Sequence, residues 1–388
     1  MIETEPTAIV LAAGEGRRLE PLTNRRPKPM MPVGDRPLLG HVVDALRAAG
    51  VRDVVFVVGY ERDRIQTHFG DGEDWGVEVR YVKQETQLGT GHALLQAESA
   101  VDGQFLVLNG DRIIDPDGVE AVWDALDCHD AAMAVARSAE PERYGVVELD
   151  GDRVDRIVEK PRGEVPSNLI NAGIYALDGG IFEVIRETPA DVDGEQSLPA
   201  AIERLEGSVG AVRYDGRWLD VSYLWDLLAV TAEVLDRDGG ENHGTVRAGA
   251  QVIGPAEIAE TATVGANAVV GRGTTVGANA RIGPNATVER SVLFPDATVG
   301  AGAVLRDCVV GANAAVGGNV TIAGGDATVI VDGEVHEDVA LGGVVGDNST
   351  VGGGAVLAPG TVIHDDATVQ AGAVAQGTVE PNATVQRG

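Results

Sequence analysis

The sequence predicts an α/β domain followed by a parallel β-helix, and two patterns carry that prediction. From residue 7 to about residue 236, short runs rich in β-branched residues alternate with helical stretches, which is typical of a sheet with parallel strands. From Val246 onward, apolar residues recur every six positions. A three-faced β-helix sustains that period and an α-helix does not. We therefore divide the 388-residue chain into a first domain (1–236), a linker (237–244) and a β-helix domain (245–388).

The elements of the first domain follow from local composition. The expected strands are Ala8–Leu11, Val54–Val58, Val77–Val82, Phe105–Leu108, Ala132–Ala136, Val146–Leu149 and Val154–Val158. The expected helices are Leu38–Ala49, Gly91–Ala97, Val119–Leu126 and Tyr223–Leu235. Ligands of such sheets bind beyond the carboxyl ends of the strands. We therefore expect Gly14–Arg18, Asn109–Asp111 and Asp220 around one crevice.

The six-residue spacing of apolar positions in the second domain shifts by one residue at two points and is interrupted once. Its expected inward positions are Val246, Val252, Ile258, Val264, Val270, Val276, Ile282, Val288 and Phe294, then Val299 and Leu305, then Val310, Val316 and Ile322, and finally Val345, Val351, Leu357, Ile363, Val369 and Ala375. The interruption at 323–340 should protrude as a loop. Flat faces rich in Gly and Val predict self-association, expected as a trimer.

Composition limits the possible partners. Acidic residues number 60 and basic residues 30, and the only lysines are Lys28, Lys83 and Lys160. Such a chain has no basic face for nucleic acid. The acidic, lysine-poor composition predicts a halophilic protein, because molar salt screens self-repulsion. Two distant cysteines, an acidic start (MIETEPT) and no apolar run of about 18 residues predict a cytoplasmic protein without disulfides, signal peptide or membrane span.

The stretch Leu11–Leu39 concentrates the features of an anion site. Its small residues Ala12-Ala13-Gly14-Glu15-Gly16 allow backbone N–H groups to face a phosphate, and Arg18 and Lys28 add positive charge. A glycine turn beside a solvated basic patch is the alternative. A dinucleotide-binding motif is a poor match, because the third glycine of G-x-G-x-x-G is missing.

Leu11–Val33 resembles the opening motif of the sugar-1-phosphate nucleotidyltransferases, L-A-A-G-x-G-x-R followed by P-K-P. The similarity continues to residue 236 and through the β-helix. The layout looks most like archaeal and bacterial bifunctional enzymes that join an N-acetylglucosamine-1-phosphate uridylyltransferase to an acetyltransferase domain. The resemblance implies a Rossmann-like, GT-A-like domain with a mixed sheet and a left-handed β-helix. It also implies transfer of a nucleotidyl group from an NTP, with UTP favoured and dTTP next, to a sugar-1-phosphate, with Mg²⁺ as cofactor and pyrophosphate as product.

The resemblance also assigns roles to residues at matching motif positions. Arg18 and Lys28 would be catalytic, and Asp111 and Asp220 would bind Mg²⁺. The nucleotide would contact Leu11, Ala13, Gly14, Gly16, Gln84, Gly89 and Thr90, and the sugar phosphate Asp111, Gly145, Glu159, Lys160 and Asn171. Structural alternatives remain: Thr90 as a helix cap, a lone aspartate as a turn residue, and Glu159–Lys160 as a surface ion pair.

The second activity of the bifunctional relatives is less well supported. It would require acetyl-CoA, a histidine base on one coil, and asparagine and lysine near the protruding loop. The coil segment 304–311 has no histidine, and the loop has neither lysine nor asparagine but five acidic residues: Asp326, Asp332, Glu334, Glu337 and Asp338. His336 and His364 stand elsewhere as candidate bases. The alternatives to a simple nucleotidyltransferase are thus a bifunctional enzyme making UDP-N-acetylglucosamine and a non-catalytic nucleotide-sugar-sensing or assembly subunit.

Overall fold

A computed structural model describes residues 6–161, 163, 165–191 and 194–387. Most of the acidic start MIETEPT therefore lies outside the described residues. The chain divides into two compact units. The first comprises Met1–Glu15, Arg26–Met30 and Leu38–Asp220, and the second comprises Gly16–Arg25, Met31–Pro37 and Val221–Gly388. None of the helices in the described part of the chain is long and apolar enough to cross a membrane.

The first unit is built on a mixed sheet whose strand order is β5-β4-β1-β6-β11-β8-β12-β10-β9. Strands β5, β4, β1 and β6 run parallel, and β11 is antiparallel to both β6 and β8. The strands are β1 (Thr7–Ala12), β4 (Asp53–Val58), β5 (Glu78–Lys83), β6 (Gln104–Asn109), β8 (Ala131–Arg137), β9 (Gly145–Asp150), β10 (Arg153–Glu159), β11 (Leu169–Asp178) and β12 (Val209–Arg213). A separate pair joins β7 (Arg112–Ile114) to β13 (Trp218–Asp220).

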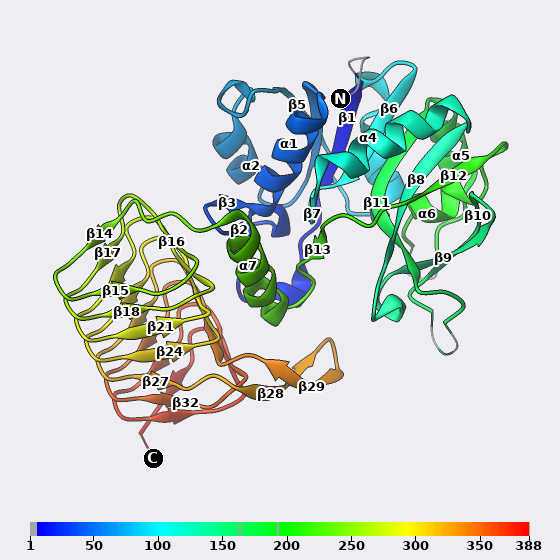
Figure 1. Cartoon of the computed structure of the whole chain (residues 1–388). Helices are drawn as coiled ribbons and strands as arrows, with labels where there is room; N and C mark the ends of the chain where they lie inside the picture. The colour runs from blue at the N-terminus through cyan, green and yellow to red at the C-terminus, as the bar shows by residue number, and fades with distance from the viewer. Residues whose placement is uncertain (1–5, 162, 164, 192–193, 388) are drawn as a thin grey trace. The chain divides into compact units, whose positions relative to one another are not determined.

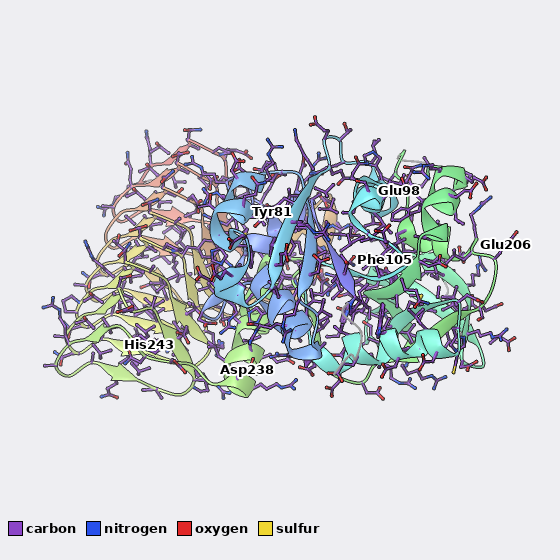
Figure 2. All side chains as sticks on the ribbon, turned by 90° about the horizontal axis from the view of Figure 1, so that it is seen from above. Tyr81, Glu98, Phe105, Glu206, Asp238 and His243 are labelled. Atoms are coloured by element: carbon purple, nitrogen blue, oxygen red, sulfur yellow. The ribbon has the colours of Figure 1, made fainter. Side chains whose placement is uncertain are left out.

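Helices cover both faces of this sheet, so its central strands are apolar on both sides. On β1, Ala8 and Val10 pack into one hydrophobic cluster and Ile9 into the other. The first cluster includes residues of α1 (Leu38–Ala49), α2 (Arg62–Phe69) and α4 (Pro116–Asp124), and the second includes residues of α3 (Gly89–Gln96), α5 (Gly180–Glu187) and α6 (Leu198–Ile202). Phe105 of β6 lies in this interior, whereas Glu206 is exposed at the edge of the unit (Figure 2).

The second unit contains the β-helix, whose short strands stack coil upon coil (Figure 1). Its three parallel sheets confirm the predicted left-handed hexapeptide-repeat architecture. One sheet is β14 (Thr245–Val246), β17 (Thr263–Val264), β20 (Arg281–Ile282), β23 (Thr298–Val299), β26 (Ala315–Val316), β31 (Thr350–Val351), β34 (Thr368–Val369) and β37 (Thr384–Val385). The next is β15 (Gln251–Val252), β18 (Val269–Val270), β21 (Thr287–Glu289), β24 (Val304–Arg306), β27 (Thr321–Ile322), β32 (Val356–Leu357) and β35 (Val374–Ala375). The third is β16 (Ala256–Ile258), β19 (Thr274–Val276), β22 (Val292–Leu293), β25 (Cys308–Val310), β30 (Gly343–Val345), β33 (Thr361–Ile363) and β36 (Thr378–Val379).

The sequence period sets the size of a coil. Val264 pairs with Ile282, one coil of three hexapeptides later. Asparagine and aspartate occupy left-handed corner positions, such as Asn267 (φ 58°) and Asp366 (φ 59°), because their short polar side chains tolerate that conformation. The prediction for Phe294 is wrong: Leu293 pairs with Val276 and belongs to the inner cluster, so the first slip comes one repeat earlier, between Val288 and Leu293.

Two further expectations need correction. The interruption of the repeat, expected as a protruding loop, is a β-hairpin of β28 (Asp326–Val331) and β29 (Glu334–Ala340), whose register shifts between Ala327 and Val329. The helix expected at Tyr223–Leu235 is α7 (Leu224–Asp238), which compactness groups with the second unit. The predicted boundary at residue 236 therefore falls within α7 and stays a prediction. The second unit also contains the pair β2 (Pro32–Val33) and β3 (Arg36–Pro37).

Candidate active site

Four charged side chains of the first unit form what we call the carboxylate cluster: Lys28, Asp111, Arg112 and Asp220. Asp111 lies between β6 and β7, and Asp220 ends β13, where the antiparallel pairing sets it opposite Arg112. Lys28 Nζ lies 2.6 Å from Asp111 Oδ2 and 3.3 Å from Asp220 Oδ1. The Arg112 guanidinium contacts both carboxylates as well, with 3.4 Å between Nη1 and Asp111 Oδ1. The two predicted metal ligands therefore share the same two cations.

Burial makes this cluster electrostatically strong. Only 2% of the Asp220 side chain and 14% of the Lys28 side chain are exposed. Burial raises the pKa of Asp111, but the Arg112 and Lys28 charges outweigh burial and hold that pKa below its ordinary value. Burial likewise opposes the charge of Arg112, and Asp111 and Asp220 raise the pKa of its guanidinium. Asp111 is thus kept ionised, which is the form of a carboxyl group that binds a metal ion.

Arg112 is the member of this cluster that the sequence analysis missed. Its guanidinium also lies 5.3 Å from the centre of the Trp218 ring, and the Trp218 indole donates to Ala172 O at 2.8 Å. The sequence offered one signal for Arg112: a charged residue that directly follows Asp111 and precedes the apolar pair Ile113-Ile114.

The donor set suits a hard divalent cation. Two carboxylates with phosphate oxygens are the usual Mg²⁺ arrangement, and Asp111 and Asp220 lie close enough to share Lys28 and Arg112. Among the described residues, no group of three or more His, Cys, Asp or Glu side chains is placed to hold a metal by itself. A metal at this pair would therefore need phosphate or water oxygens as further ligands.

Three of the predicted sugar-phosphate residues lie together on neighbouring strands. Gly145 pairs with Glu159 across β9 and β10, and a Cβ at Gly145 would lie 2.8 Å from Glu159 Oε2 and 3.7 Å from Asn171 Cβ. Asn171 is fixed by Tyr175, whose hydroxyl accepts from its side-chain amide at 2.7 Å. Lys160 has a positive φ (41°), and its ammonium lies 3.9 Å from Glu159. A side chain at position 145 would therefore have to displace the Glu159 carboxylate.

The predicted base-recognition residues contact one another's segment and the start of α6. Gln84 is buried, and its amide nitrogen lies 3.3 Å from Gly89 O and 2.9 Å from His92 Nδ1. Gly89 (φ 91°) is required locally, because a Cβ there would lie 2.6 Å from Gln196 O. Thr90 Oγ1 accepts a hydrogen bond from Leu198 N at 3.1 Å, so its hydroxyl holds α6. Thr90 is not the cap of its own helix, because α3 begins at Gly89 with Leu88 as N-cap and no side-chain cap hydrogen bond. Its role in base recognition stays a prediction.

The glycine loop is divided between the units. In the first unit, Leu11 lies within β1, and Ala13 and Gly14 follow that strand; Ala13 O accepts from the Gln87 side chain at 2.8 Å. A Cβ at Gly14 would meet nothing within 4 Å, so its backbone is open to a ligand. Gly16 and Arg18 belong to the second unit, where Thr23 donates to Gly16 O at 3.0 Å. The expected grouping of Arg18 with Lys28 around one crevice stays a prediction.

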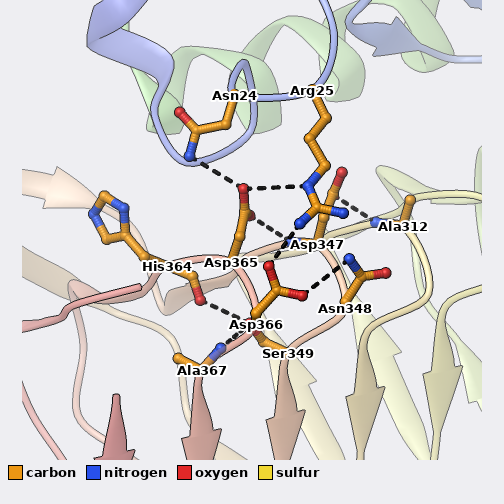
Figure 3. A network of polar contacts seen from close by, with 10 residues as sticks. All are labelled: Asn24, Arg25, Ala312, Asp347, Asn348, Ser349, His364, Asp365, Asp366 and Ala367. Carbon is orange, nitrogen blue, oxygen red and sulfur yellow. Dashed lines mark hydrogen bonds and ion pairs between the residues drawn. The ribbon is translucent and has the colours of Figure 1, made fainter. Parts of the chain in front are cut away.

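The segment Gly16–Arg25, which carries Arg18, is fastened to a row of carboxylates on the β-helix (Figure 3). Asn24 Nδ2 donates to Asp365 Oδ2 at 3.1 Å, and Arg25 Nη2 lies 2.6 Å from Asp366 Oδ2. Asp365 in turn accepts from Asp347 N at 2.8 Å. Burial raises the pKa of Asp365, although the hydrogen bond from Asn24 lowers it.

Comparison with known protein families matches three stretches of this chain. Residues 7–237 match Nucleotidyl transferase, residues 252–342 match the GMPPB C-terminal domain, and residues 344–374 match the Hexapeptide repeat of succinyl-transferase. The bifunctional protein GlmU of Methanococcus maripaludis (strain C7 / ATCC BAA-1331) is 35% identical over 261 residues, covering 66% of this chain and 61% of the relative. The match therefore spans about 61% of that curated relative's length.

Two further relatives match the first domain over most of their own length. The UTP–glucose-1-phosphate uridylyltransferase AglF of Haloferax volcanii is 38% identical over 223 residues, covering 56% of this chain and 91% of the relative. A solved structure of a putative glucose-1-phosphate thymidylyltransferase from Bacillus anthracis aligns with a TM-score of 0.55 and 27% identity, covering 62% of this chain and 97% of that one. Because the first family match spans more than half of the described sequence, this chain belongs to the nucleotidyl transferase family.

Proposed function

We propose that this protein is a sugar-1-phosphate nucleotidyltransferase that uses UTP in preference to dTTP and releases pyrophosphate. The observation that carries the proposal is the carboxylate cluster, in which Lys28 and Arg112 hold Asp111 and Asp220 together in a buried place. Transfer requires a sugar-phosphate oxygen to attack the α-phosphorus of the triphosphate. Two anions must meet, so catalysis depends on positive charge placed where negative charge builds up.

The residues of the chain divide this work. Lys28 would neutralise the triphosphate, and the open backbone at Gly14 would lie against it. Arg18 would add a second cation, and Arg112 would keep Asp111 ionised while it holds Asp220 beside it. A Mg²⁺ bound by Asp111 and Asp220, as members of this family typically use, would polarise phosphate oxygens and help pyrophosphate to leave.

The sugar-1-phosphate would bind beside Gly145, Glu159 and Asn171. Glu159 is positioned to accept from sugar hydroxyls, and Lys160 would face the phosphate. The preference for UTP rests on Gln84, Gly89 and Thr90 and on likeness to the uridylyltransferase AglF. The names of the relatives differ in nucleotide and sugar, which makes both choices part of the test.

For the second unit we propose self-association, as a trimer, in a halophilic setting. Val356 and Val374 face outward from one sheet and are 43% and 69% exposed. We do not propose acyl transfer with acetyl-CoA, because the five acidic residues of the β28–β29 hairpin would repel the phosphates of CoA.

The test is pyrophosphate release from a panel of sugar-1-phosphates mixed with each of four NTPs and Mg²⁺ in molar KCl. We expect turnover with at least one sugar and UTP, less with dTTP, and loss of turnover on chelation that Mg²⁺ restores. Failure of every pair, together with failure to bind any NTP, would indicate a non-catalytic subunit. Thiol release from acetyl-CoA with glucosamine-1-phosphate would instead establish the bifunctional alternative.

A further inference from the structure

The insertion in the β-helix has the geometry of a defined arm. Val331 pairs with Glu334, so the turn consists of Asp332 and Gly333 alone. Both have positive φ, 51° and 80°, as a type I′ turn requires, and Asp-Gly is a preferred pair for it. The carboxylate of Asp332 is therefore held at the tip of a regular hairpin.

That tip contacts a residue expected to act on the nucleotide. Within the second unit, Arg18 Nε lies 3.4 Å from Asp332 Oδ2, and the same guanidinium lies 5.8 Å from the centre of the Tyr223 ring. Tyr223 is the N-cap of α7 and forms a capping box with Asp226, so the ring belongs to a fixed helix end. Arg18 thus lies between a hairpin carboxylate and an aromatic face.

A second contact holds the hairpin on the same helix end. The Tyr223 and Trp225 rings stack at 4.7 Å, and the His336 ring lies 4.7 Å from Tyr223 and 5.1 Å from Trp225. His336 Nε2 is buried without a hydrogen-bond partner in the described part of the chain. His336 therefore packs on the rings as a flat side chain, independently of the charge on Asp332.

The ion pair between Arg18 and Asp332 is exposed, so another anion can readily replace the Asp332 carboxylate. The Arg18 side chain is 41% exposed and that of Asp332 64%, and exposed pairs contribute little to stability. A triphosphate offers arginine several strong acceptor oxygens in place of one carboxylate. Asp332 and a triphosphate would compete for the same guanidinium.

We propose that the β28–β29 hairpin is a latch: Asp332 holds Arg18 when no nucleotide is bound, and the triphosphate displaces it. The repeat domain then sets nucleotide affinity through two positioning residues, Asp332 and His336. This inference rests on the proposed function for its assignment of Arg18.

The experiment compares Asp332→Asn with Asp338→Asn. Asparagine is also favoured in a type I′ turn, so Asp332→Asn removes the charge and keeps the turn. Asp338 is an exposed residue of the same hairpin with positive φ (56°), so Asp338→Asn removes an equal charge under equal backbone demands. We measure the Kd of inorganic tripolyphosphate and of UTP with Mg²⁺, and both KM values in turnover.

The expected result is a Kd and a nucleotide KM lower by about two- to five-fold in Asp332→Asn, the range that an exposed ion pair supports. The KM of the sugar-1-phosphate should stay unchanged, and Asp338→Asn should match the wild type. Equal affinities in the two variants, or weaker binding in Asp332→Asn, would overturn the latch. Binding of tripolyphosphate needs no turnover, so a wild type that is inactive with every substrate pair would refute the proposed function and leave this comparison readable.

A double-mutant cycle tests the anchor. His336→Ala should also tighten triphosphate binding, because the hairpin then holds Asp332 near Arg18 less firmly. The effects of Asp332→Asn and His336→Ala should be less than additive, since both remove the same restraint. Full additivity, or weaker binding in His336→Ala, would contradict an anchor that acts through Asp332.

Discussion

The carboxylate cluster and the latch both join cations to aspartates, but they do so in different surroundings. In the cluster, Asp111 and Asp220 each contact both Lys28 and Arg112, and 2% of the Asp220 side chain is exposed. In the latch, Arg18 meets one aspartate, and both side chains reach solvent. In the carboxylate cluster each charged group contacts two groups of opposite charge, whereas in the latch Arg18 contacts one carboxylate that another anion can replace.

The difference has energetic consequences. Removing one partner from a buried charge network leaves the others unpaired and costs roughly 3–5 kcal/mol, whereas an exposed pair contributes about 1 kcal/mol at most. Chemistry that needs a fixed arrangement therefore suits the cluster. A contact that a substrate must displace suits the latch.

The strongest test of the comparison is removal of one charge from the cluster. Asp111→Asn should lower turnover by roughly 10²- to 10³-fold, because a proposed Mg²⁺ ligand is lost and the two cations of the cluster lose a partner. Pyrophosphate release at saturating substrates measures it. Asp155→Asn, an exposed residue of β10, is the control and should retain full rate. Full activity in Asp111→Asn would show that the cluster is not the active site.

A second test asks whether the sugar side belongs with the cluster. In Gly145→Ala the new methyl group would displace the Glu159 carboxylate, a flexible side-chain end, so the backbone should be unaffected. We expect about a ten-fold rise in the KM of the sugar-1-phosphate with nucleotide Kd unchanged. Gly179→Ala, where a Cβ meets open space and φ is −61°, is the matched control. An unchanged sugar KM would place the sugar elsewhere.

The third test measures how thermal stability depends on pH. It concerns Asp365, one of the β-helix carboxylates that contact the segment Gly16–Arg25. Burial raises the pKa of Asp365 in the folded protein, so folding penalises its ionised form. As pH falls through that raised pKa, the folded state binds a proton that the unfolded state does not yet bind, and this residue's contribution to stability increases. Relative to Asp365→Asn, the wild type should therefore gain melting temperature as the pH is lowered from neutral through the raised pKa of Asp365. If the melting temperatures of the wild type and of Asp365→Asn changed in parallel with pH, Asp365 would not contribute to the pH dependence of stability.

The smallest effect expected is a difference in salt response. Raising KCl from about 0.2 M to molar concentrations shortens the screening length to a few ångströms. The two- to five-fold advantage of Asp332→Asn in nucleotide affinity should therefore shrink towards unity, while the defect of Asp111→Asn persists because its partners are buried. The Kd of the nucleotide across a salt series gives the first curve, and pyrophosphate release at saturating substrates across the same series gives the second. An advantage of Asp332→Asn that did not change with salt would mean that the latch is not electrostatic.

Regular patterning made much of the fold predictable. The bounds of α1 agree with the expected Leu38–Ala49, because its apolar residues recur at helical spacing and Gly50 follows. The α/β domain and the hexapeptide β-helix are confirmed, since both depend on periodicity that a single sequence displays. Strand β11 was not expected: Asn171 and Gly173 interrupt its apolar run, and its pairing with β8 is irregular between Asn171 and Tyr175.

The candidate site was predictable where a motif stood at a strand end and unpredictable where tertiary pairing decided it. Asp111 and Asp220 were expected together, and the pairing of β7 with β13 accounts for their proximity. Arg112 was missed because its importance comes from facing Asp220 across that pair. The contact of Arg18 with Asp332 joins residues more than three hundred positions apart, which no local pattern encodes.

The place of the hairpin within the β-helix bears on how such a protein could change over time. Strand β25 pairs directly with β30 in continuous register, with Cys308 opposite Gly343 and Val310 opposite Val345, as though nothing intervened. The arm can therefore be shortened, lengthened or exchanged without shifting a single coil. Evolution, or a protein engineer, could transplant such an arm between scaffolds while the stacked coils stay intact.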